Sequence, residues 1–301
     1  MKLLVTGALN CTGEQLDLLR DIGYEIIFMQ NESDELPDGA ENVEGVICNG
    51  LFLHHNIEQF EKLRFIQLTS AGYDRVPMEY IIEKGIKIFN ARGVYSIPMA
   101  EFALSGVLQL YKNARFFYEN QKKCRWEKNR QLLELYGKSV CIVGCGSVGN
   151  ECAKRFSSFG CSVTGVDVTP YDCKFYEKMV TLSELDTVLE EADIVVLTLP
   201  LTEETAGLFD ENRFKKMKQG AVLVNISRGA VVCEKALIKA LNDNLFGAVL
   251  DVFESEPLDT TSPLWNMENV IVTPHNSFVG EGNGGRLFNV ICENLKGFSF
   301  I

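Results

Sequence analysis

The sequence predicts an α/β protein that contains two doubly wound parallel sheets. Short apolar runs alternate with amphipathic stretches through the first 90 residues, a second alternating series begins at Ser139, and a glycine-rich turn follows the first strand of that series. At roughly 150 residues for each domain, the chain of 301 residues is long enough for two. Its 46% hydrophobic and 23% charged residues are typical of globular proteins and exclude a disordered chain.

The first series predicts five strands separated by helices. Gly23 and Gly85 fall where the first and third of these helices are expected to end. Strands are expected at residues 2–5, 25–29, 45–48, 65–68 and 87–89, and helices at 13–22, 56–63 and 78–84.

A long helix is expected from Pro98 to Asn120. Proline suits the first turn of a helix, and Ala103, Val107 and Leu110 mark one apolar face. A polar connector that contains Trp126 then leads into the second series. There the strands are expected at 139–143, 162–166, 194–199, 221–226, 246–250 and 270–272, and the helices at 148–159, 183–191, 211–217, 234–242 and 281–298.

Charge and cysteine usage exclude several classes of partner. Lysine and arginine total 29 against 41 aspartates and glutamates, so the net charge of −12 disfavours nucleic acid and anionic membranes as partners. No apolar run approaches the ~20 residues of a membrane helix, and Met1–Val5 is expected to be a first strand rather than a signal peptide. The ten cysteines form no Cys-x-x-Cys pair, so reduced thiols, no metal site and a cytoplasmic location are expected.

The segment Gly144–Gly149 has the pattern G-x-G-x-x-G between a predicted strand and a predicted helix. Glycines in this position allow a tight turn and a close approach of the backbone to a pyrophosphate at the helix N-terminus. Asp167 ends the next strand, where a carboxylate accepts hydrogen bonds from ribose hydroxyls and repels a 2′-phosphate. NAD is therefore expected rather than NADP. Cys145 lies inside the turn, and a helix N-terminus could make its thiol redox-sensitive.

Three ionisable residues follow the ends of later predicted strands, namely Arg228, Glu256 and His275. Strand ends of a doubly wound sheet converge on the ligand crevice, so all three are expected to face the nicotinamide. Reduction of a 2-keto acid needs a proton donor for the developing alkoxide, which a histidine supplies. A carboxylate on the other ring nitrogen stabilises the imidazolium, and an arginine binds the substrate carboxylate and polarises the carbonyl. Glu254 competes with Glu256 for the place beside the histidine.

Taken together, these motifs resemble the D-isomer-specific 2-hydroxyacid dehydrogenase family. The segments that carry the resemblance appear in the family's order, and they are the glycine turn preceded by Tyr136-Gly137-Lys138, then residues 199–205, 225–229, 250–257 and 273–275, with weaker matches at 70–74 and 99–101. Asn276-Ser277 departs from the small pair that usually follows the histidine. Glu256 disfavours the formate dehydrogenases of the superfamily, which carry glutamine there.

The resemblance implies a Rossmann NAD-binding domain inserted into a flavodoxin-like substrate domain. Residues 96–277 would bind NAD, residues 1–95 with 278–301 would form the substrate domain, and the active site would lie in the cleft between them. It further implies a homodimer formed through the NAD-binding domain, by the region that follows the long helix.

The resemblance also assigns roles to residues. Arg228 would bind substrate, Glu256 would partner the histidine, and His275 would be the acid and base, while backbone amides around Ala71 and Gly72 would hold the substrate carboxylate beside Tyr73. Asp167 would contact the ribose, Thr205 a phosphate and Asp251 the carboxamide. The full set of expected cofactor contacts is Gly144, Gly146, Ser147, Val148, Gly149, Asp167, Leu199, Pro200, Thr205, Ile226, Ser227 and Asp251.

The expected reaction is the NADH-dependent reduction of a 2-keto acid to a D-2-hydroxy acid. Two alternatives stay open at this point: a phosphoglycerate dehydrogenase-type enzyme and a non-enzymatic NAD-sensing regulator of the same fold. The expected loop over the substrate side chain, residues 48–53, holds no lysine or arginine, which favours a small or apolar keto acid. Arg64, Arg75 and Arg92 keep a phosphorylated substrate open.

Overall fold

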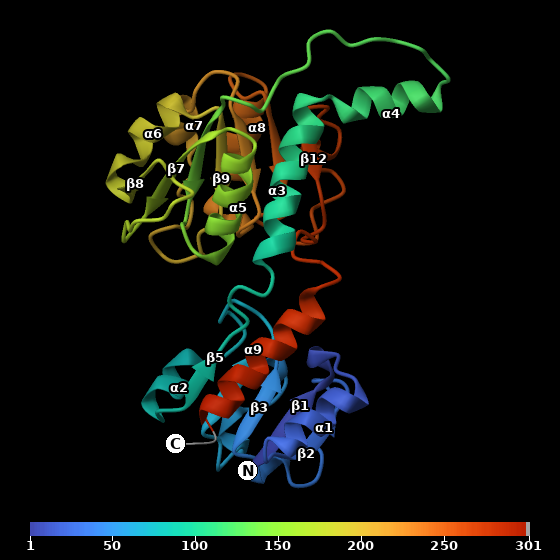
Figure 1. Ribbon diagram of the computed structural model, residues 1–301, viewed down its shortest axis with the longest axis vertical. Coiled ribbons are helices and arrows are strands. Elements are labelled where there is room, and N and C mark those ends of the chain that lie inside the picture. The colour runs from blue at the N-terminus through green and yellow to red at the C-terminus, as the bar shows by residue number, and fades with distance from the viewer. Residues whose placement is uncertain (299–301) are drawn as a thin grey trace. The chain divides into compact units, whose positions relative to one another are not determined.

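A computed structural model describes residues 1–298 of the chain (Figure 1). The chain divides into two compact units: Met1–Tyr95 together with the segment from Gly280 onward, here called the N-terminal unit, and Ser96–Val279, here called the central unit. The junctions expected from the sequence were at residues 95/96 and 277/278.

The N-terminal unit contains a five-stranded sheet in the order β2-β1-β3-β4-β5, with every pair parallel. The order reverses between β1 and β3, which makes the sheet doubly wound. Its strands are β1 Lys2–Thr6, β2 Glu25–Met29, β3 Gly45–Cys48, β4 Phe65–Leu68 and β5 Lys87–Phe89. Its helices are α1 Gly13–Asp21, α2 Met78–Glu83 and α9 Asn283–Phe298, with 3-10 turns η1 Gly7–Leu9, η2 Ala40–Asn42, η3 Leu51–Leu53 and η4 Ile57–Gln59.

Alternate residues of these strands face opposite sides of the sheet and pack into two cores. Leu3 and Val5 of β1 pack with α1 and α9, whereas Leu4 packs with Ile81 of α2 on the other face. Helix α9 returns from the far end of the chain to complete the first core. Its Asn294 Nδ2 donates to Gln67 Oε1 at 2.8 Å, and its Arg286 Nε donates to the carbonyl of Val94 at 2.8 Å.

The central unit contains a seven-stranded parallel sheet in the order β12-β11-β10-β9-β6-β7-β8. Its strands are β6 Ser139–Val143, β7 Ser162–Asp167, β8 Lys178–Thr181, β9 Ile194–Leu197, β10 Val222–Asn225, β11 Gly247–Leu250 and β12 Val270–Val272. Its helices are α3 Ser96–Tyr111, α4 Ala114–Lys122, α5 Ser147–Ser158, α6 Leu185–Glu191, α7 Glu211–Lys216 and α8 Glu234–Leu241, with 3-10 turns η5 Leu182–Glu184, η6 Gly229–Val231 and η7 Pro263–Trp265.

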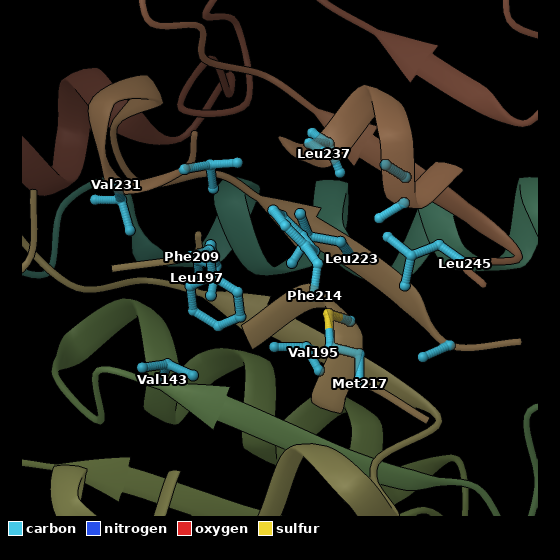
Figure 2. Packing of buried hydrophobic residues seen from close by; sticks show 14 of the residues in the cluster. Val143, Val195, Leu197, Phe209, Phe214, Met217, Leu223, Val231, Leu237 and Leu245 are labelled. Atoms are coloured by element: carbon cyan, nitrogen blue, oxygen red, sulfur yellow. The ribbon is translucent and has the colours of Figure 1, made fainter. Parts of the chain in front are cut away.

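Helices cover both faces of this sheet, as the fold class predicts. Helices α3 and α5 pack on one face, and α6, α7 and α8 pack on the other. Figure 2 shows part of the core on the side of α6, α7 and α8, in which Phe214 and Leu237 of the helices form one buried cluster with Val195, Leu197 and Leu223 of the central strands. Full burial of such a side chain contributes about 1.5–3 kcal/mol, so these faces hold the strand ends rigidly in place. The predicted α/β class with two doubly wound parallel sheets is confirmed.

Two helix predictions are wrong. Residues 56–63 form only the short turn η4, because the backbone leaves helical geometry at Phe60, whose φ is −97° and ψ 75°. The single helix expected from Pro98 to Asn120 is two helices, because Asn113 between α3 and α4 takes a left-handed backbone with φ 49°. Strand β8 was not predicted, since its sequence Lys-Met-Val-Thr at the sheet edge is half polar and only partly buried.

Candidate functional site

Three neighbouring strands of the central unit end in loops that carry the predicted acid-base histidine, its carboxylate partner and the substrate-binding arginine. Strand β10 leads to Arg228, β11 leads to Asp251 and Glu256, and β12 leads to His275. These strands are adjacent and parallel in the order β12-β11-β10, so their carboxyl ends meet at one edge of the sheet.

His275 and Glu256 are in direct contact. The Nδ1 atom of His275 lies 2.8 Å from Glu256 Oε2, and both side chains are partly exposed. Glu256 is itself held by the backbone N–H of Phe253, which donates to Oε1 at 3.1 Å. A carboxylate on Nδ1 leaves Nε2 as the nitrogen that can face a substrate, and it stabilises the positive charge of an imidazolium.

Of the two competing carboxylates, Glu256 is the one beside the histidine. Glu254 accepts a hydrogen bond of 2.7 Å from the backbone N–H of Glu234, the first residue of α8. Its charge therefore lies at a helix N-terminus, where a carboxylate is stabilised by the unpaired N–H groups.

Asp251 organises the loop that carries the histidine. Its side chain is fully buried, and its two oxygens accept from Thr273 Oγ1 at 2.7 Å, from Asn276 N at 2.7 Å and from Ser277 N at 2.9 Å. Its carbonyl accepts from His275 N at 2.8 Å. These bonds hold His275 in a left-handed backbone conformation with φ 51°, which is uncommon for a residue with a side chain.

Arg228 lies in a loop fixed by Asn225. The Asn225 side chain accepts from the backbone and hydroxyl of Ser227, at 3.1 and 2.8 Å, and donates to the carbonyl of Arg228 at 3.1 Å. A Cβ at Gly229 would lie 1.8 Å from the backbone of Phe253, so this loop crosses directly over the loop that leads to Glu256. Only glycine permits that crossing, and the close approach joins the arginine loop to the glutamate loop.

The glycine turn has the geometry of a dinucleotide cradle. Gly144 has φ 96°, and a Cβ at Gly149 would lie 2.2 Å from the carbonyl oxygen of Gly144. Gly146 caps α5, and no described heavy atom lies within 4 Å of where its Cβ would be, so its backbone faces open space. A pyrophosphate could approach there against the first N–H groups of α5, at Ser147 and Val148. The residues present therefore fit NAD.

The neighbouring loops surround this turn. Asp167, at the end of β7, accepts from the N–H of Cys145 at 2.7 Å, which aligns its carboxylate with the turn. After β9, Leu199 is buried while Pro200 is exposed, and Thr205 Oγ1 donates to the Pro200 carbonyl at 2.7 Å. Ile226 and Ser227 are also buried, at 1% and 5% exposure, so any contact that they make with a cofactor is expected to come from their backbone.

Cys145 lacks the low pKa that its place near a helix N-terminus suggested. Its side chain is buried against the core, and burial raises the pKa of the thiol to about 12. The thiol therefore stays protonated near neutral pH, which argues against redox sensitivity.

The N-terminal unit holds the turn Ser70–Tyr73 at the carboxyl end of β4. The carbonyls of Ser70, Ala71 and Gly72 accept from Ala91 N, Asn90 Nδ2 and Ser70 Oγ, at 2.8, 2.7 and 3.1 Å. Within residues 1–298, no hydrogen-bond acceptor is found for the N–H groups of Ala71, Gly72 and Tyr73. The turn thus uses its acceptors internally and keeps adjacent donors for an anion.

Comparison with known proteins decides the family. Residues 104–277 match the sequence profile of the D-isomer specific 2-hydroxyacid dehydrogenase, NAD binding domain.

The chain belongs to the D-isomer specific 2-hydroxyacid dehydrogenase family.

Relatives of this dehydrogenase act on different acids. It is 35% identical over 247 residues to a glyoxylate reductase of Korarchaeum cryptofilum, with 80% of this chain and 74% of the relative covered. It is 31% identical over 303 residues to a D-3-phosphoglycerate dehydrogenase of Methanocaldococcus jannaschii, which covers 98% of this chain but only 57% of that relative. A crystal structure of a family protein from Aeromonas salmonicida superposes with a TM-score of 0.82 at 29% identity, covering 99% and 94% of the two chains.

The resemblance seen in the sequence is thereby confirmed, and so are the enzyme class and the cofactor. This dehydrogenase is an NAD-dependent oxidoreductase of 2-hydroxy acids. No helix within residues 1–298 is long and apolar enough to cross a membrane, and no cluster of three or more potential metal-ligating side chains occurs in that part of the chain.

Two features of this dehydrogenase were not found from the sequence. One is the use of the Asp251 carboxylate to hold residues 273–277, for which an aspartate directly after an apolar strand was the only available signal. The other is Tyr171, whose hydroxyl donates to the carbonyl of Cys145 at 2.6 Å and also contacts the Asn150 side chain. Tyr171 closes the outer side of the glycine turn, and no sequence pattern indicates that contact.

Proposed function

We propose that this chain reduces a 2-keto acid to the D-2-hydroxy acid with NADH, and that His275 donates the proton. The observation that carries the proposal is the contact of 2.8 Å between His275 Nδ1 and Glu256. It orients the ring, leaves Nε2 for the substrate oxygen, and supplies the negative charge that an imidazolium requires.

Each side chain of the proposed site has a separate role in the reaction. When bound, NADH supplies the hydride that adds to the carbonyl carbon of the acid. His275 donates its proton to the carbonyl oxygen as charge develops there, and Glu256 stabilises the charged ring beforehand. The Arg228 guanidinium holds the substrate carboxylate and polarises the carbonyl. The N–H groups of Ala71 and Gly72, for which no acceptor is found within residues 1–298, also bind the carboxylate beside the aromatic side chain of Tyr73.

The test is the oxidation of NADH in the presence of a panel of keto acids, followed by chiral analysis of the product. We expect turnover of glyoxylate, pyruvate or hydroxypyruvate, and the D-isomer wherever the product is chiral. Formation of the L-isomer would contradict the proposed stereochemistry. Absence of turnover with every acid, together with intact NADH binding, would favour the NAD-sensing regulator instead.

We also propose that NADH is preferred over NADPH. The Asp167 carboxylate, aligned by the N–H of Cys145, lies where the adenosine ribose is bound in this fold. The two residues that follow it are Val168 and Thr169, so neither brings a cation for a 2′-phosphate. The ratio of kcat/KM for the two cofactors tests this assignment, and equal values would contradict it.

The alternative of a phosphoglycerate dehydrogenase-type enzyme keeps the same catalytic residues and changes only the substrate. The chain spans a little more than half of the phosphoglycerate dehydrogenase relative, 57% of its length. Because phosphohydroxypyruvate is the keto acid that corresponds to 3-phosphoglycerate, it is included in the same panel of acids to test this alternative.

A homodimer through the central unit is the oligomer that we propose. Helix α4 and the segment after it extend away from the rest of this unit (Figure 1), and Trp126 on that segment is 98% exposed. Residues 117–130 enclose a hollow of about 920 Å³. A second hollow of about 460 Å³, lined mainly by carbon atoms, lies along α3 beside Leu104 and Leu108. Exposed aromatic and apolar surface of this kind is typical of an interface.

We also propose that the enzyme is located in the cytoplasm, where its ten free cysteines stay reduced.

A further inference from the structure

The side chain of Glu32 lies at the point in the N-terminal unit where the strand order reverses, between β1 and β3. Glu32, after β2, accepts from Thr6 Oγ1 at 2.7 Å, from Asn49 N at 2.7 Å and from Gly50 N at 2.6 Å. It therefore joins the end of β1 to the loop after β3. Ligands of doubly wound sheets bind at the carboxyl ends of the strands beside such a reversal, so these loops are a natural place for substrate recognition.

Arg75 lies beside the same loop. A Cβ at Gly50 would lie 3.4 Å from Glu32 Oε2 and 4.0 Å from Arg75 Cδ, so the stem of the arginine packs where Gly50 has no side chain. Residues 49–53, which directly follow β3, include no lysine or arginine, and Arg75 brings a cation beside them from the loop after β4.

Arg75 is an exposed residue, and within residues 1–298 no hydrogen bond from its guanidinium is found. Within the described part of the chain, no carboxylate oxygen lies within 4.0 Å of its nitrogens. Glu32, the acidic side chain beside Gly50, already accepts three hydrogen bonds from Thr6, Asn49 and Gly50.

Arg64 does not share this position. It precedes β4 and therefore lies at the opposite edge of the sheet, where its guanidinium is 3.8 Å from Glu44 and 5.3 Å from the ring centre of Phe298. Its charge is used for packing within the unit. Between Arg64 and Arg75, only Arg75 lies at the edge where the strands end.

Arg75 belongs to the same short loop as the anion-binding turn. Within residues 1–298, no acceptor is found for the N–H groups of residues 71–73, and the Val76 N–H donates to the Tyr73 carbonyl at 3.3 Å, which folds Arg75 into the next turn. The N–H of Thr69 donates to the Cys48 carbonyl at 2.9 Å and fastens this loop to the loop after β3. The backbone N–H groups of residues 71–73 and the guanidinium of Arg75, both of a kind that binds anions, therefore lie on one loop that hydrogen bonds hold in place.

We propose that Arg75 is a specificity-determining residue, and that it selects 2-keto acids carrying a second anionic group, a phosphate, sulfonate or carboxylate, on the side chain. The inference rests on the proposed function, in which the turn at Ala71 and Gly72 holds the first carboxylate. It replaces the expectation of a small or apolar substrate, which rested mainly on the uncharged residues 48–53, and it takes up the phosphorylated substrate that Arg75 had kept open.

The experiment compares acids that differ in the charge of the group on C3. Pyruvate and hydroxypyruvate are the neutral pair, and oxaloacetate, 3-sulfopyruvate and phosphohydroxypyruvate are the anionic set and distinguish the three chemistries. The full-length enzyme and its Arg75→Ala, Arg75→Lys and Lys62→Ala variants are assayed with NADH. Lys62→Ala is the matched control, since it removes one exposed positive charge just before β4, at the opposite edge of the sheet.

We expect at least one anionic acid to exceed both neutral acids in kcat/KM. Arg75→Ala should lower kcat/KM for that acid by about 10- to 100-fold, the range for a hydrogen bond to a charged group, mainly through KM. Turnover of pyruvate should change by less than about twofold, because a neutral methyl group gains nothing from the charge. Arg75→Lys should recover part of the loss, and Lys62→Ala should behave as the wild type.

The outcomes separate this inference from the proposed function. If the wild type prefers neutral acids, or if Arg75→Ala leaves the ratio of anionic to neutral turnover unchanged, the inference is wrong while the proposed function stands. If no acid is reduced, the proposed function is wrong, and calorimetric titration of the NAD-loaded protein with 3-phosphoglycerate and with D-lactate tests Arg75 directly. Tighter binding of 3-phosphoglycerate that is lost in Arg75→Ala would still support the anion site, and equal binding would overturn it.

Discussion

His275 depends on residues remote in sequence for its backbone conformation and for the direction of its ring. The backbone bonds around Asp251 hold the residue at a positive φ, and Glu256 holds the ring by Nδ1. Neither contact involves a neighbour in the sequence, so the acid-base group is set by two long-range carboxylates. Because an uncommon backbone angle requires support from the surroundings, the loop at residues 273–277 is the strained part of the site.

Loss of the acid or of the anchor should nearly abolish turnover. We expect His275→Ala and Arg228→Ala each to lower kcat by about two to four orders of magnitude, the range for a general acid or an electrostatic contact to developing charge. Steady-state kinetics with NADH and the best keto acid measures the effect. Unchanged binding of NADH, followed by fluorescence, is the control for folding, and a loss smaller than about tenfold would contradict the assigned roles.

Exchange of Glu256 for glutamine should slow the reaction. Glu256→Gln keeps a group that can hydrogen-bond to Nδ1 of His275 but removes the negative charge that lies beside the ring. We expect kcat for reduction to fall by at least about tenfold, part of the ~10²–10⁴-fold that a positioned general acid contributes. Steady-state kinetics measures the effect, and Glu254→Gln is the matched control, because its carboxylate contacts the Glu234 N–H instead. A loss in the control and none in Glu256→Gln would assign the role to Glu254.

At the scale of elements, the glycine turn packs directly against the first turn of α5. The third glycine, Gly149, lets the helix pack on the carbonyl of Gly144, and a methyl group there would meet that oxygen at 2.2 Å. The helix N-terminus would have to move away from the turn that it completes.

We therefore expect Gly149→Ala to weaken NADH binding by roughly 10- to 100-fold, the effect of a displacement near 1 Å in a positioned site. Fluorescence titration measures the Kd. Gly285→Ala is the matched control, since Gly285 lies inside α9, no described heavy atom comes within 4 Å of its Cβ position, and the change should stabilise the helix by about 0.5–1 kcal/mol. Wild-type affinity in Gly149→Ala would contradict this account of the turn.

Asp193 lies at the amino ends of the strands of the same sheet and joins the start of β6 to the segment before β10. It precedes β9, and its carboxylate accepts from Ser139 N at 3.0 Å and from Lys218 Nζ at 2.8 Å. Burial by itself would raise the pKa of this carboxyl. The hydrogen bonds from Lys218 and the Ser139 amide lower the pKa by more than burial raises it, so the pKa in the folded state lies below its usual value.

A carboxyl with a lowered folded-state pKa stabilises the protein above its unfolded pKa of about 3.9, and the stabilisation disappears as the pH falls through the folded value. Asp193→Asn should therefore lower the free energy of unfolding by about 1–3 kcal/mol at pH 7. The difference between variant and wild type should shrink below about pH 4. Urea denaturation at a series of pH values tests this, and a difference that is constant with pH would contradict the assignment.

At the scale of the whole molecule, the segment after α3 has little to pack against within its own unit. Trp126 is 98% exposed, and Tyr118 on α4 is 59% exposed. A net charge of −12 keeps separate copies apart at long range, so association must come from apolar contacts at short range.

We expect the enzyme to sediment as a dimer, and Trp126→Ala to raise its dissociation constant by at least tenfold, because large aromatic side chains dominate interfaces. Sedimentation velocity at several concentrations measures both. Trp265→Ala is the matched control, since Trp265 is a partly exposed tryptophan of the same unit whose Nε1 donates to the carbonyl of Asp259. A monomeric wild type at micromolar concentration would contradict the proposed dimer.

Most strands and the glycine turn were predictable because their signals are local. Apolar runs such as Val140–Val143 and Ile194–Leu197 are bounded by turn residues, and the spacing of three glycines needs no knowledge of distant contacts. The break at Asn113 was missed because a single left-handed residue leaves the apolar pattern on both sides intact. Strand β8 was missed because an edge strand has only one neighbour and tolerates polar residues.

The sequence by itself determined the α/β class, the dinucleotide turn and the three side chains proposed for the chemistry, since each follows within a few residues of a recognisable strand. Only the tertiary structure decided which glutamate meets His275, because Glu254 and Glu256 lie two positions apart and both follow β11. Only the tertiary structure shows that the Asp251 carboxylate accepts hydrogen bonds from the loop that carries His275. Only the tertiary structure shows that Arg75 of one loop lies beside Gly50 of another. Contacts between segments remote in sequence depend on how the strands are ordered in the sheet, and no local pattern of residues encodes that order.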